Sequence, residues 1–263
     1  TGDKKIKLED IKIRPLDERK ICGRRSAMEL KKGDVINLGV GMPDSVANAC
    51  AEEGISDYIY LSVESGPTGG VPIGGVVFGA SINPDSVIPT AEQFDAYNGG
   101  CLDMAVVGLA EVDKHGNVNV SKFGTRVTGP GGFINITQST KKIIFMGTFK
   151  ALDLEEKIED GKLIIIQEGK KNKFVDSVEQ ITFSSEQAIK NKQEVLYVTE
   201  RCVFTLTKDG IMLTEIAPGV DLEKDIIANM DFKPLISKNL KEMDHRIFQE
   251  QKMNIKEDFL KEN

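Results

Sequence analysis

A strand–helix–strand pattern in the first third of the chain is the feature that most constrains its fold. The run DVINLGV (34–40) is short, apolar and rich in β-branched residues, as expected of a buried strand. The segment PDSVANACAEEG (43–54) starts near a proline and ends at a glycine, which is typical of a helix. A second apolar strand, YIYLSV (58–63), follows. This order predicts a parallel βαβ unit.

The remaining segments extend the same pattern and then become rich in strands. We expect helices over 15–31, 91–100 and 221–230, and strands over 104–112, 117–124 and 141–149. Beyond residue 162 we expect a hairpin around Gly169 and Asn172, and then three strands within 194–219 with a Lys-Asp-Gly turn at 208–210. The sequence therefore predicts an α/β fold: an open, mostly parallel sheet with flanking helices and a β-rich second half.

The chain shows no internal repeat and no long flexible linker. Residues 1–263 are therefore predicted to form a single domain, with 239–263 as a charged C-terminal helix or tail. The N-terminal segment TGDKKIKLED carries no signal peptide and lacks an initiator Met. We expect a processed piece or a part of a longer polypeptide.

Charge and cysteine usage exclude several classes of protein. A net charge of −7 argues against a nucleic-acid surface, and no apolar run reaches the roughly 20 residues that span a bilayer. The four cysteines are far apart and form no C-x-x-C, so neither a zinc site nor a disulfide framework is expected. Free thiols in a reducing cytoplasm are the expectation, with no metal and no membrane.

One carboxylate stands at the end of the second predicted strand. In YLSVESGPTGGVPIGG (60–75), Glu64 directly follows the apolar run and Gly66 begins a series of glycines. Ligands of open α/β sheets bind at the carboxyl ends of strands, and glycines let a substrate approach the backbone closely. The alternative is that Glu64 is a surface acid on a turn that the glycines shape.

Two other glycine-rich segments suggest binding loops. In GVGMPD (39–44), Gly39 and Gly41 partly match a dinucleotide fingerprint, but Asp44 stands where a third glycine would lie and would repel a pyrophosphate. In TGPGGF (128–133), Gly129, Gly131 and Gly132 form a candidate oxyanion cradle, the alternative being a linker turn. Neither histidine, His115 or His245, belongs to a ligand or triad pattern, and no G-x-S-x-G is present.

With these residues in view, the sequence resembles the C-terminal, beta-type half of family I coenzyme A transferases, and is most similar to the acetate/propionate branch. The resemblance covers nearly the whole chain and rests on its matching segments, which are PLDERKICGRRSAMEL, GVGMPDSVAN, SVESGPTGGVP, FDAYNGGCLDMAVVGLAEVDKHGNVNVSKFG, TGPGGFINI and LTEIAPGVDLEKDI.

The resemblance implies a function and a set of site residues. It implies that Glu64 becomes a covalent glutamyl-CoA thioester and that the N–H groups of Gly131 and Gly132 approach the reacting carbonyl. Gly39 and Gly41 would line the same cleft, and Asn98, Gly99 and Gly100 match a further turn of the family pattern. Coenzyme A would be a substrate, exchanged between acyl-CoA and short carboxylic acids, with no cofactor. The N-terminal half of the family, absent from this sequence, would be a partner, so an oligomer is expected.

Two other functions stay open at this point. The same glutamate would serve an acyl-CoA hydrolase, in which water intercepts the glutamyl intermediate. A non-enzymatic module that binds CoA, a nucleotide or a sugar phosphate would keep the glycine loops, although Glu64 is a poor neighbour for a phosphate.

Overall fold

The computed structural model describes residues 5–7 and 13–261. The charged segment 1–10, on which the expectation of no signal peptide rests, lies mostly outside the described residues, as do the last two residues of the chain. Among the described residues, no helix combines the length and the apolar character needed to cross a bilayer.

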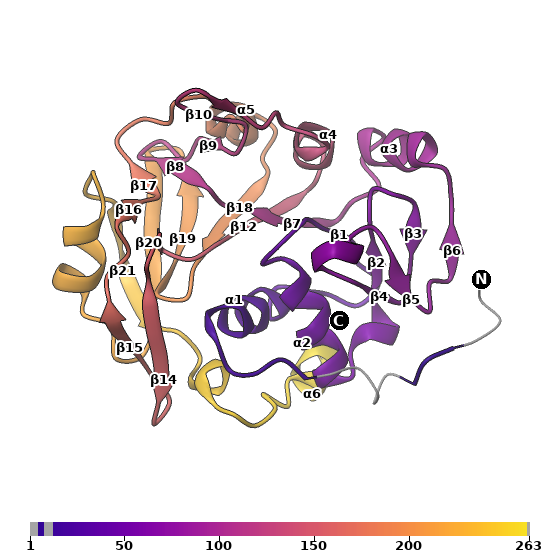
Figure 1. The fold of residues 1–263 in the computed structure, drawn as a ribbon, viewed down its shortest axis with the longest axis horizontal. Coiled ribbons are helices and arrows are strands. Elements are labelled where there is room, and N and C mark those ends of the chain that lie inside the picture. The colour runs from indigo at the N-terminus through magenta and orange to yellow at the C-terminus, as the bar shows by residue number, and fades with distance from the viewer. Residues whose placement is uncertain (1–4, 8–12, 262–263) are drawn as a thin grey trace.

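A ten-stranded mixed sheet forms the centre of the molecule (Figure 1). Its five middle strands run parallel in the order β2-β1-β7-β12-β18, while β19, β20 and β21 extend one edge and β3 and β6 the other. The strands are β1 (Val35–Leu38), β2 (Tyr60–Ser62), β3 (Pro67–Thr68), β6 (Ser86–Val87), β7 (Met104–Gly108), β12 (Lys142–Met146), β18 (Glu194–Val198), β19 (Cys202–Thr207), β20 (Gly210–Ile216) and β21 (Leu235–Glu242).

Helices cover both faces of this sheet. Figure 1 shows α1, α2 and α6 on one side and α3, α4 and α5 on the other. The helices are α1 (Glu18–Ala27), α2 (Asp44–Glu53), α3 (Thr90–Asn98), α4 (Phe133–Gln138), α5 (Ser185–Lys190) and α6 (Lys256–Lys261). The predicted α/β class, with a parallel centre and flanking helices, is confirmed.

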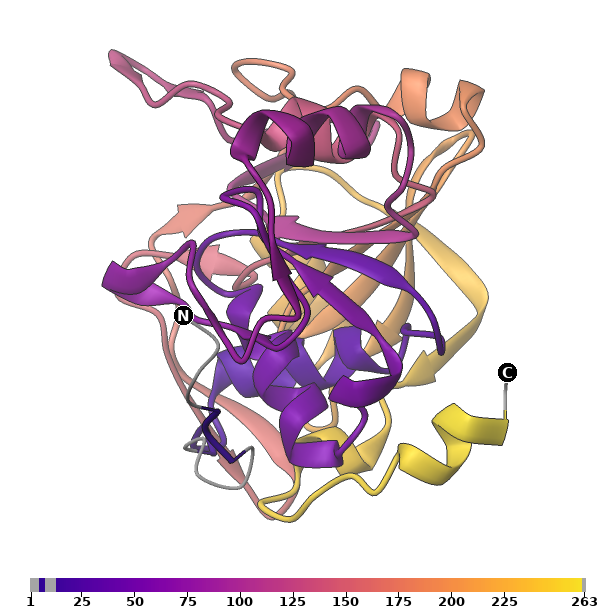
Figure 2. The same cartoon turned by 90° about the vertical axis from the view of Figure 1, so that its right-hand side faces the viewer.

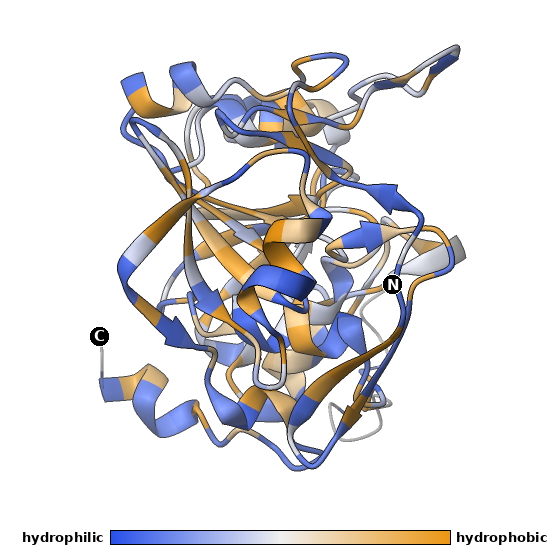
Figure 3. Cartoon of the chain, turned by 90° about the vertical axis from the view of Figure 1, so that its left-hand side faces the viewer, coloured by the Kyte–Doolittle hydropathy of each residue, from blue (hydrophilic) through white to orange (hydrophobic). Residues whose placement is uncertain are grey.

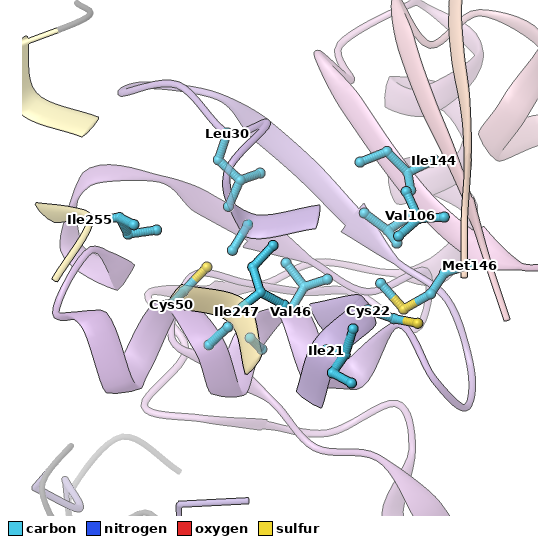
Figure 4. Packing of buried hydrophobic residues seen from close by; sticks show 14 of the residues in the cluster. Ile21, Cys22, Leu30, Val46, Cys50, Val106, Ile144, Met146, Ile247 and Ile255 are labelled. Carbon is cyan, nitrogen blue, oxygen red and sulfur yellow. The ribbon is translucent and has the colours of Figure 1, made fainter. Parts of the chain in front are cut away.

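Alternating side chains of the central strands supply the two cores. In β12, Ile144 and Met146 join the core beneath α1 and α2, while Ile143 and Phe145 join the core beneath α3 and α4. Figure 4 shows the first of these cores, in which Val106, Ile144 and Met146 face side chains of α1 and α2. Strand residues point to opposite faces in turn, so continuous apolar runs fit a sheet that is covered on both sides.

Smaller sheets account for the β-rich second half. They are built from β4 (Val71–Pro72) with β5 (Ser81–Ile82), β10 (Lys122–Phe123) with β11 (Arg126–Val127), β13 (Lys150–Ala151) with β16 (Lys171–Asn172), β14 (Glu155–Glu159) with β15 (Lys162–Gln167), and β8 (Glu111–Asp113) with β9 (Val118–Asn119) and β17 (Phe174–Val175). The hairpin of β10 and β11 projects from the body in Figure 2, and Figure 3 shows the strands of the interior as largely hydrophobic.

Several local expectations were wrong. The run after residue 162 forms no hairpin around Gly169 and Asn172. Both of its strands instead pair antiparallel with strands that precede them in the chain: β15 with β14, and β16 with β13. The run 104–112 is divided between β7 and β8. In place of an α-helix over 221–230 there is a π-helical turn, Leu222–Ile226, followed by the 3-10 turn Ile227–Asn229.

The C-terminal segment also differs from the expected charged helix or tail over 239–263. It contains the end of β21, the turn η6 (His245–Phe248) and the short helix α6. Ile247, Phe248 and Phe259 are buried in the core. The fully buried guanidinium of Arg24 holds this segment by donating hydrogen bonds to the carbonyls of Ile247, Gln249 and Gln251. The assignment of residues 1–263 to a single domain stays a prediction.

Candidate active site

Glu64 lies just beyond the carboxyl end of β2, at the point where the chain turns into the glycine-rich segment. The residues before it, Leu61 to Val63, are buried, whereas Glu64 itself is half-buried. Because β1 pairs in parallel with both β2 and β7, the carboxyl ends of these three strands meet at one edge of the sheet. The structure thus places Glu64 where open α/β sheets bind their ligands.

A chain of hydrogen bonds holds the residues behind Glu64. The Asn37 amide lies 3.5 Å from Glu64 Oε2, a long contact, and donates to the Tyr97 hydroxyl at 3.2 Å. The Tyr97 hydroxyl donates to Ser62 Oγ at 3.0 Å, and Ser62 donates to the Ile36 carbonyl at 2.9 Å. Burial raises the pKa of Tyr97, and the nearby charge of Glu64 raises it further. The phenol therefore keeps its proton and acts as a donor at neutral pH.

A cavity of about 280 Å³ opens in front of Glu64. Strand ends and the 130–133 loop form its walls. The lining residues are Gly39, Val40, Glu64, Val107, Gly108, Val120, Pro130, Gly131, Gly132, Phe133 and Ile136. Four residues predicted for the site, Gly39, Glu64, Gly131 and Gly132, are thus brought to one cavity from three separate segments of the chain.

The 130–133 loop needs its glycines for two reasons. Gly131 has a φ of +52°, a conformation that side chains disfavour. At Gly132 a Cβ would lie 2.8 Å from Cζ of Phe94, so any side chain would displace the ring. Within the described part of the chain, the N–H groups of Gly131 and Gly132 have no hydrogen-bond acceptor. They are therefore open to an acceptor supplied by a ligand.

Six other predicted site residues do not line this cavity: Gly41, Gly66, Asn98, Gly99, Gly100 and Gly129. Gly66 shapes the turn after Glu64, since a Cβ there would lie 2.0 Å from the Ile88 carbonyl oxygen. Asn98 accepts hydrogen bonds from Asn135 and Gln138 and so ties the end of α3 to α4. Gly66 and Asn98 thus have structural contacts outside the cavity, and a direct role for any of the six residues stays a prediction.

Sequence reasoning missed the apolar lining and the support behind Glu64. Val107, Val120, Phe133 and Ile136 look like ordinary core residues, and only the packing of distant segments brings them to one cavity. Asn37 did carry a signal, because it is a polar residue inside the apolar run DVINLGV. A buried amide needs hydrogen-bond partners, so its presence in a buried strand indicates a polar network.

The partial dinucleotide fingerprint leads to no phosphate site. Asp44 is the first residue of α2 and lies 3.7 Å from Arg14 in an ion pair. Its carboxylate occupies the N-terminal end of the helix, where a pyrophosphate would otherwise be attracted. Both histidines are exposed and outside the cavity lining. In the described residues, no group of three or more His, Cys, Asp or Glu side chains is placed to hold a metal ion.

Comparison with known proteins identifies the family. The coenzyme A transferase family matches residues 21–224, and the chain belongs to it. The caffeate CoA-transferase of Acetobacterium woodii is 52% identical over 254 residues, which cover 95% of this chain and 48% of that protein. The expected resemblance is confirmed.

Two further relatives indicate which part of the family the chain represents. The acetate CoA-transferase YdiF of Escherichia coli O157:H7 is 50% identical over 234 residues, or 89% of this chain and 44% of YdiF. Its crystal structure as a thioester complex with CoA has a TM-score of 0.87, 47% identity, and coverage of 93% of this chain and 46% of that one. The acetate CoA-transferase subunit beta of E. coli K12 is 30% identical over 217 residues, or 79% of this chain and 89% of the subunit. The chain spans about half of the first two relatives and most of a beta subunit.

Proposed function

We propose that this chain transfers coenzyme A between a short-chain acyl-CoA and a carboxylate such as acetate, together with the second half that its longer relatives possess. The observation that carries the proposal is the position of Glu64: it faces the cavity that the Gly131–Gly132 loop borders. A relative of about 47% identity that was solved as a thioester with CoA supports the same chemistry.

The reaction would begin with attack on the acyl-CoA carbonyl by the Glu64 carboxylate. The thioester bond breaks, CoA leaves as its thiolate, and a mixed anhydride forms between Glu64 and the acyl group. The thiolate then attacks the Glu64 carbonyl of this anhydride, which releases the first carboxylate and leaves a Glu64–CoA thioester. A second carboxylate repeats the two steps in reverse order, leaves with CoA and regenerates Glu64.

Each residue around the cavity would have a definite task. The N–H groups of Gly131 and Gly132 would donate to the oxyanion of the tetrahedral intermediates, an interaction whose loss costs about 3 kcal/mol in comparable sites. The apolar lining would exclude water, which otherwise hydrolyses the anhydride and the thioester. Asn37 would orient the Glu64 carboxylate through the contact at Oε2.

The partners follow from the same proposal. Acyl-CoA and short carboxylic acids would be the small-molecule partners, and coenzyme A would be a substrate, with no metal or other cofactor. The second half of the enzyme would close the cavity from its open side, either in the same polypeptide or as a separate subunit, in an oligomer. All four cysteines are unpaired, which supports a reducing compartment such as the cytoplasm.

Omitting the acceptor acid distinguishes CoA transfer from hydrolysis, because only hydrolysis proceeds without it. With the complete enzyme and an acyl-CoA, we expect acyl exchange with added acetate in ping-pong kinetics, and little free CoA when acetate is omitted. A thiol assay of free CoA without acetate measures hydrolysis, and chromatographic detection of acetyl-CoA with acetate present measures transfer. Rapid CoA release without any acceptor would instead establish a hydrolase, and reversible binding with neither reaction would establish a binding module.

Replacing Asn37 tests the support behind the carboxylate. A hydrogen bond as long as 3.5 Å contributes about 1 kcal/mol or less, so we expect Asn37→Ala to lower kcat by up to about fivefold. The KM for acyl-CoA should change little, because Asn37 lies behind Glu64 and outside the cavity lining. Asn48→Ala is the matched control: this amide donates to the Asp44 carbonyl on α2. An undiminished kcat in Asn37→Ala would disprove the positioning role.

A further inference from the structure

Three polar side chains are buried together behind Glu64, between the sheet and α3. They are Asn37 of β1, Ser62 of β2 and Tyr97 of α3, and each is at most 1% exposed. Asn37 and Ser62 are paired in the parallel register of β1 and β2, so their side chains point to the same face of the sheet. Burial of polar groups is tolerated where hydrogen bonds replace their hydration. The hydrogen bonds of these three residues therefore determine how the cluster is ordered.

One backbone carbonyl sets the direction of the hydrogen bonds in this cluster. A carbonyl oxygen only accepts, so the Ser62 hydroxyl, 2.9 Å from the Ile36 carbonyl, uses its single proton there. The Tyr97 hydroxyl, 3.0 Å from Ser62 Oγ, therefore donates its own proton to that oxygen. The Tyr97 oxygen is then left as an acceptor, and the Asn37 amide donates to it at 3.2 Å.

The Asn37 amide is held by its nitrogen. Among the described residues, Asn37 Oδ1 is buried without a hydrogen-bond partner. The nitrogen contacts the Tyr97 hydroxyl at 3.2 Å, and the Ser62 carbonyl and Glu64 Oε2 at 3.5 Å each. Hydrogen bonds weaken as they lengthen beyond about 3.2 Å, so the Tyr97 hydroxyl is the strongest anchor of this amide.

Tyr97 is fixed in turn by its place on α3. Its ring lies edge-on to that of Phe94, with 6.0 Å between the ring centroids and 81° between the planes. Phe94 abuts the 130–133 loop, since a Cβ on Gly132 would lie 2.8 Å from its ring. The helix α3 thus places a hydroxyl group behind Glu64 and an aromatic ring behind the loop that would bind the oxyanion.

We propose that Tyr97 is a positioning residue: its hydroxyl holds the Asn37 amide so that an N–H is directed at Glu64 Oε2. The proposal rests on the proposed function, because it takes the Glu64 carboxylate as the nucleophile. The contact at Oε2 favours one orientation of the carboxylate, and Oε1, which has no hydrogen-bond partner in the described part of the chain, is left to attack the acyl carbonyl. Tyr97 itself does not line the cavity, so it acts through Asn37.

Tyr97→Phe in the complete enzyme tests the proposal, because it removes the hydroxyl and keeps the ring. We expect kcat for exchange between an acyl-CoA and acetate to fall about threefold to fivefold, the effect of one ordinary hydrogen bond. The KM for acyl-CoA should equal that of the wild type, since the cavity lining is unchanged. Tyr197→Phe is the matched control: this buried hydroxyl donates to the Gly116 carbonyl, away from the cavity, and its loss should leave kcat unchanged.

A double variant distinguishes positioning from a general loss of packing. In Asn37→Ala the Tyr97 hydroxyl has no amide to hold, so the addition of Tyr97→Phe should lower kcat no further. Two independent structural defects would instead multiply their effects. Ser62→Ala is a second probe, because it removes the acceptor of the Tyr97 proton. It should lower kcat when Asn37 is present and leave it unchanged in the Asn37→Ala background.

Three results would overturn the proposal while CoA transfer stands: a wild-type kcat in Tyr97→Phe, an equal fall in Tyr197→Phe, or a further severalfold fall when Tyr97→Phe is added to Asn37→Ala. If Tyr97→Phe does not fold, Ser62→Ala with and without Asn37 decides the question in the same way. If the wild type exchanges no acid at all, the proposed function fails and takes this inference with it.

Discussion

Glu64→Gln should lower CoA exchange by at least about a thousandfold. The amide has nearly the shape of the carboxylate, but it cannot attack a thioester carbonyl to form an anhydride, so the covalent route is lost entirely. The substitution leaves the surrounding structure in place. Among the described residues, the one hydrogen bond to the Glu64 side chain comes from Asn37, and a glutamine oxygen can accept it as well. Steady-state exchange between acetate and an acyl-CoA measures the effect.

Two companion variants make this result specific. Ser65→Ala changes the exposed neighbour of Glu64, whose hydroxyl donates to the Gly79 carbonyl outside the cavity, and should retain most of the exchange. Glu64→Asp keeps the charge but withdraws it by one methylene, and it should be far less active than the wild type because the reacting atoms no longer meet. Full exchange by Glu64→Gln would remove Glu64 from the mechanism.

Arg201→Met should destabilise the fold by about 3–5 kcal/mol, because removal of one partner from a buried ion pair leaves the others uncompensated. The Arg201 guanidinium is fully buried and contacts three carboxylates: Glu156 at 3.0 Å, Glu168 at 2.8 Å and Glu200 at 3.2 Å. Urea unfolding at pH 7 measures the loss. The matched control is Arg246→Met, whose ion pairs with Asp244 and Asp258 are partly exposed and should contribute about 1 kcal/mol or less.

The stability that Arg201→Met loses relative to the wild type should also depend on pH. Burial and the charge of Glu200 raise the pKa of Glu156 to about 9, although Arg201 opposes this shift. Without Arg201 the carboxyl groups should hold protons still more strongly in the folded state than in the unfolded state. Folding then binds protons, so stability falls as pH rises above about 4.5 towards the folded pKa. The wild type shares this loss up to about pH 9, and the two proteins diverge only where its Glu156 ionises beside Arg201. The Arg201→Met deficit should therefore be larger at pH 9.5 than at pH 7, and an equal deficit at both would contradict this explanation.

The parallel centre of the fold could be predicted because its signals are local. The runs that form β1 and β2 are apolar and β-branched, and Gly54 ends α2 in the left-handed conformation that glycine favours. The pairing of β14 with β15 has a local signal too, which the expected hairpin at Gly169 overlooked: Asp160 and Gly161 form a two-residue turn in which both have a positive φ. The pairing of β13 with β16 could not be predicted in this way, because the whole β14–β15 hairpin separates the two strands.

The site was predictable only in part, for a related reason. Glu64 and the 131–132 glycines are unusual for their places in the sequence, so the sequence alone predicts them as candidate site residues. Val107 and Val120 are not unusual, and they reach the same cavity only because β1, β7 and the 130–133 loop are adjacent in three dimensions. Asn98 is the opposite case: its place in a motif suggested the site, whereas its hydrogen bonds join α3 to α4.

The most direct test of the central claim is the mass of the peptide that contains Glu64. The complete enzyme is incubated with acyl-CoA in the absence of an acceptor acid, quenched, digested and examined by mass spectrometry. We predict that this peptide gains the mass of CoA less one water, that acetate removes the adduct, and that Glu64→Gln never acquires it. A CoA adduct on another residue, or turnover without any adduct while the trapped intermediate of a known transferase is detected in parallel, would contradict the claim.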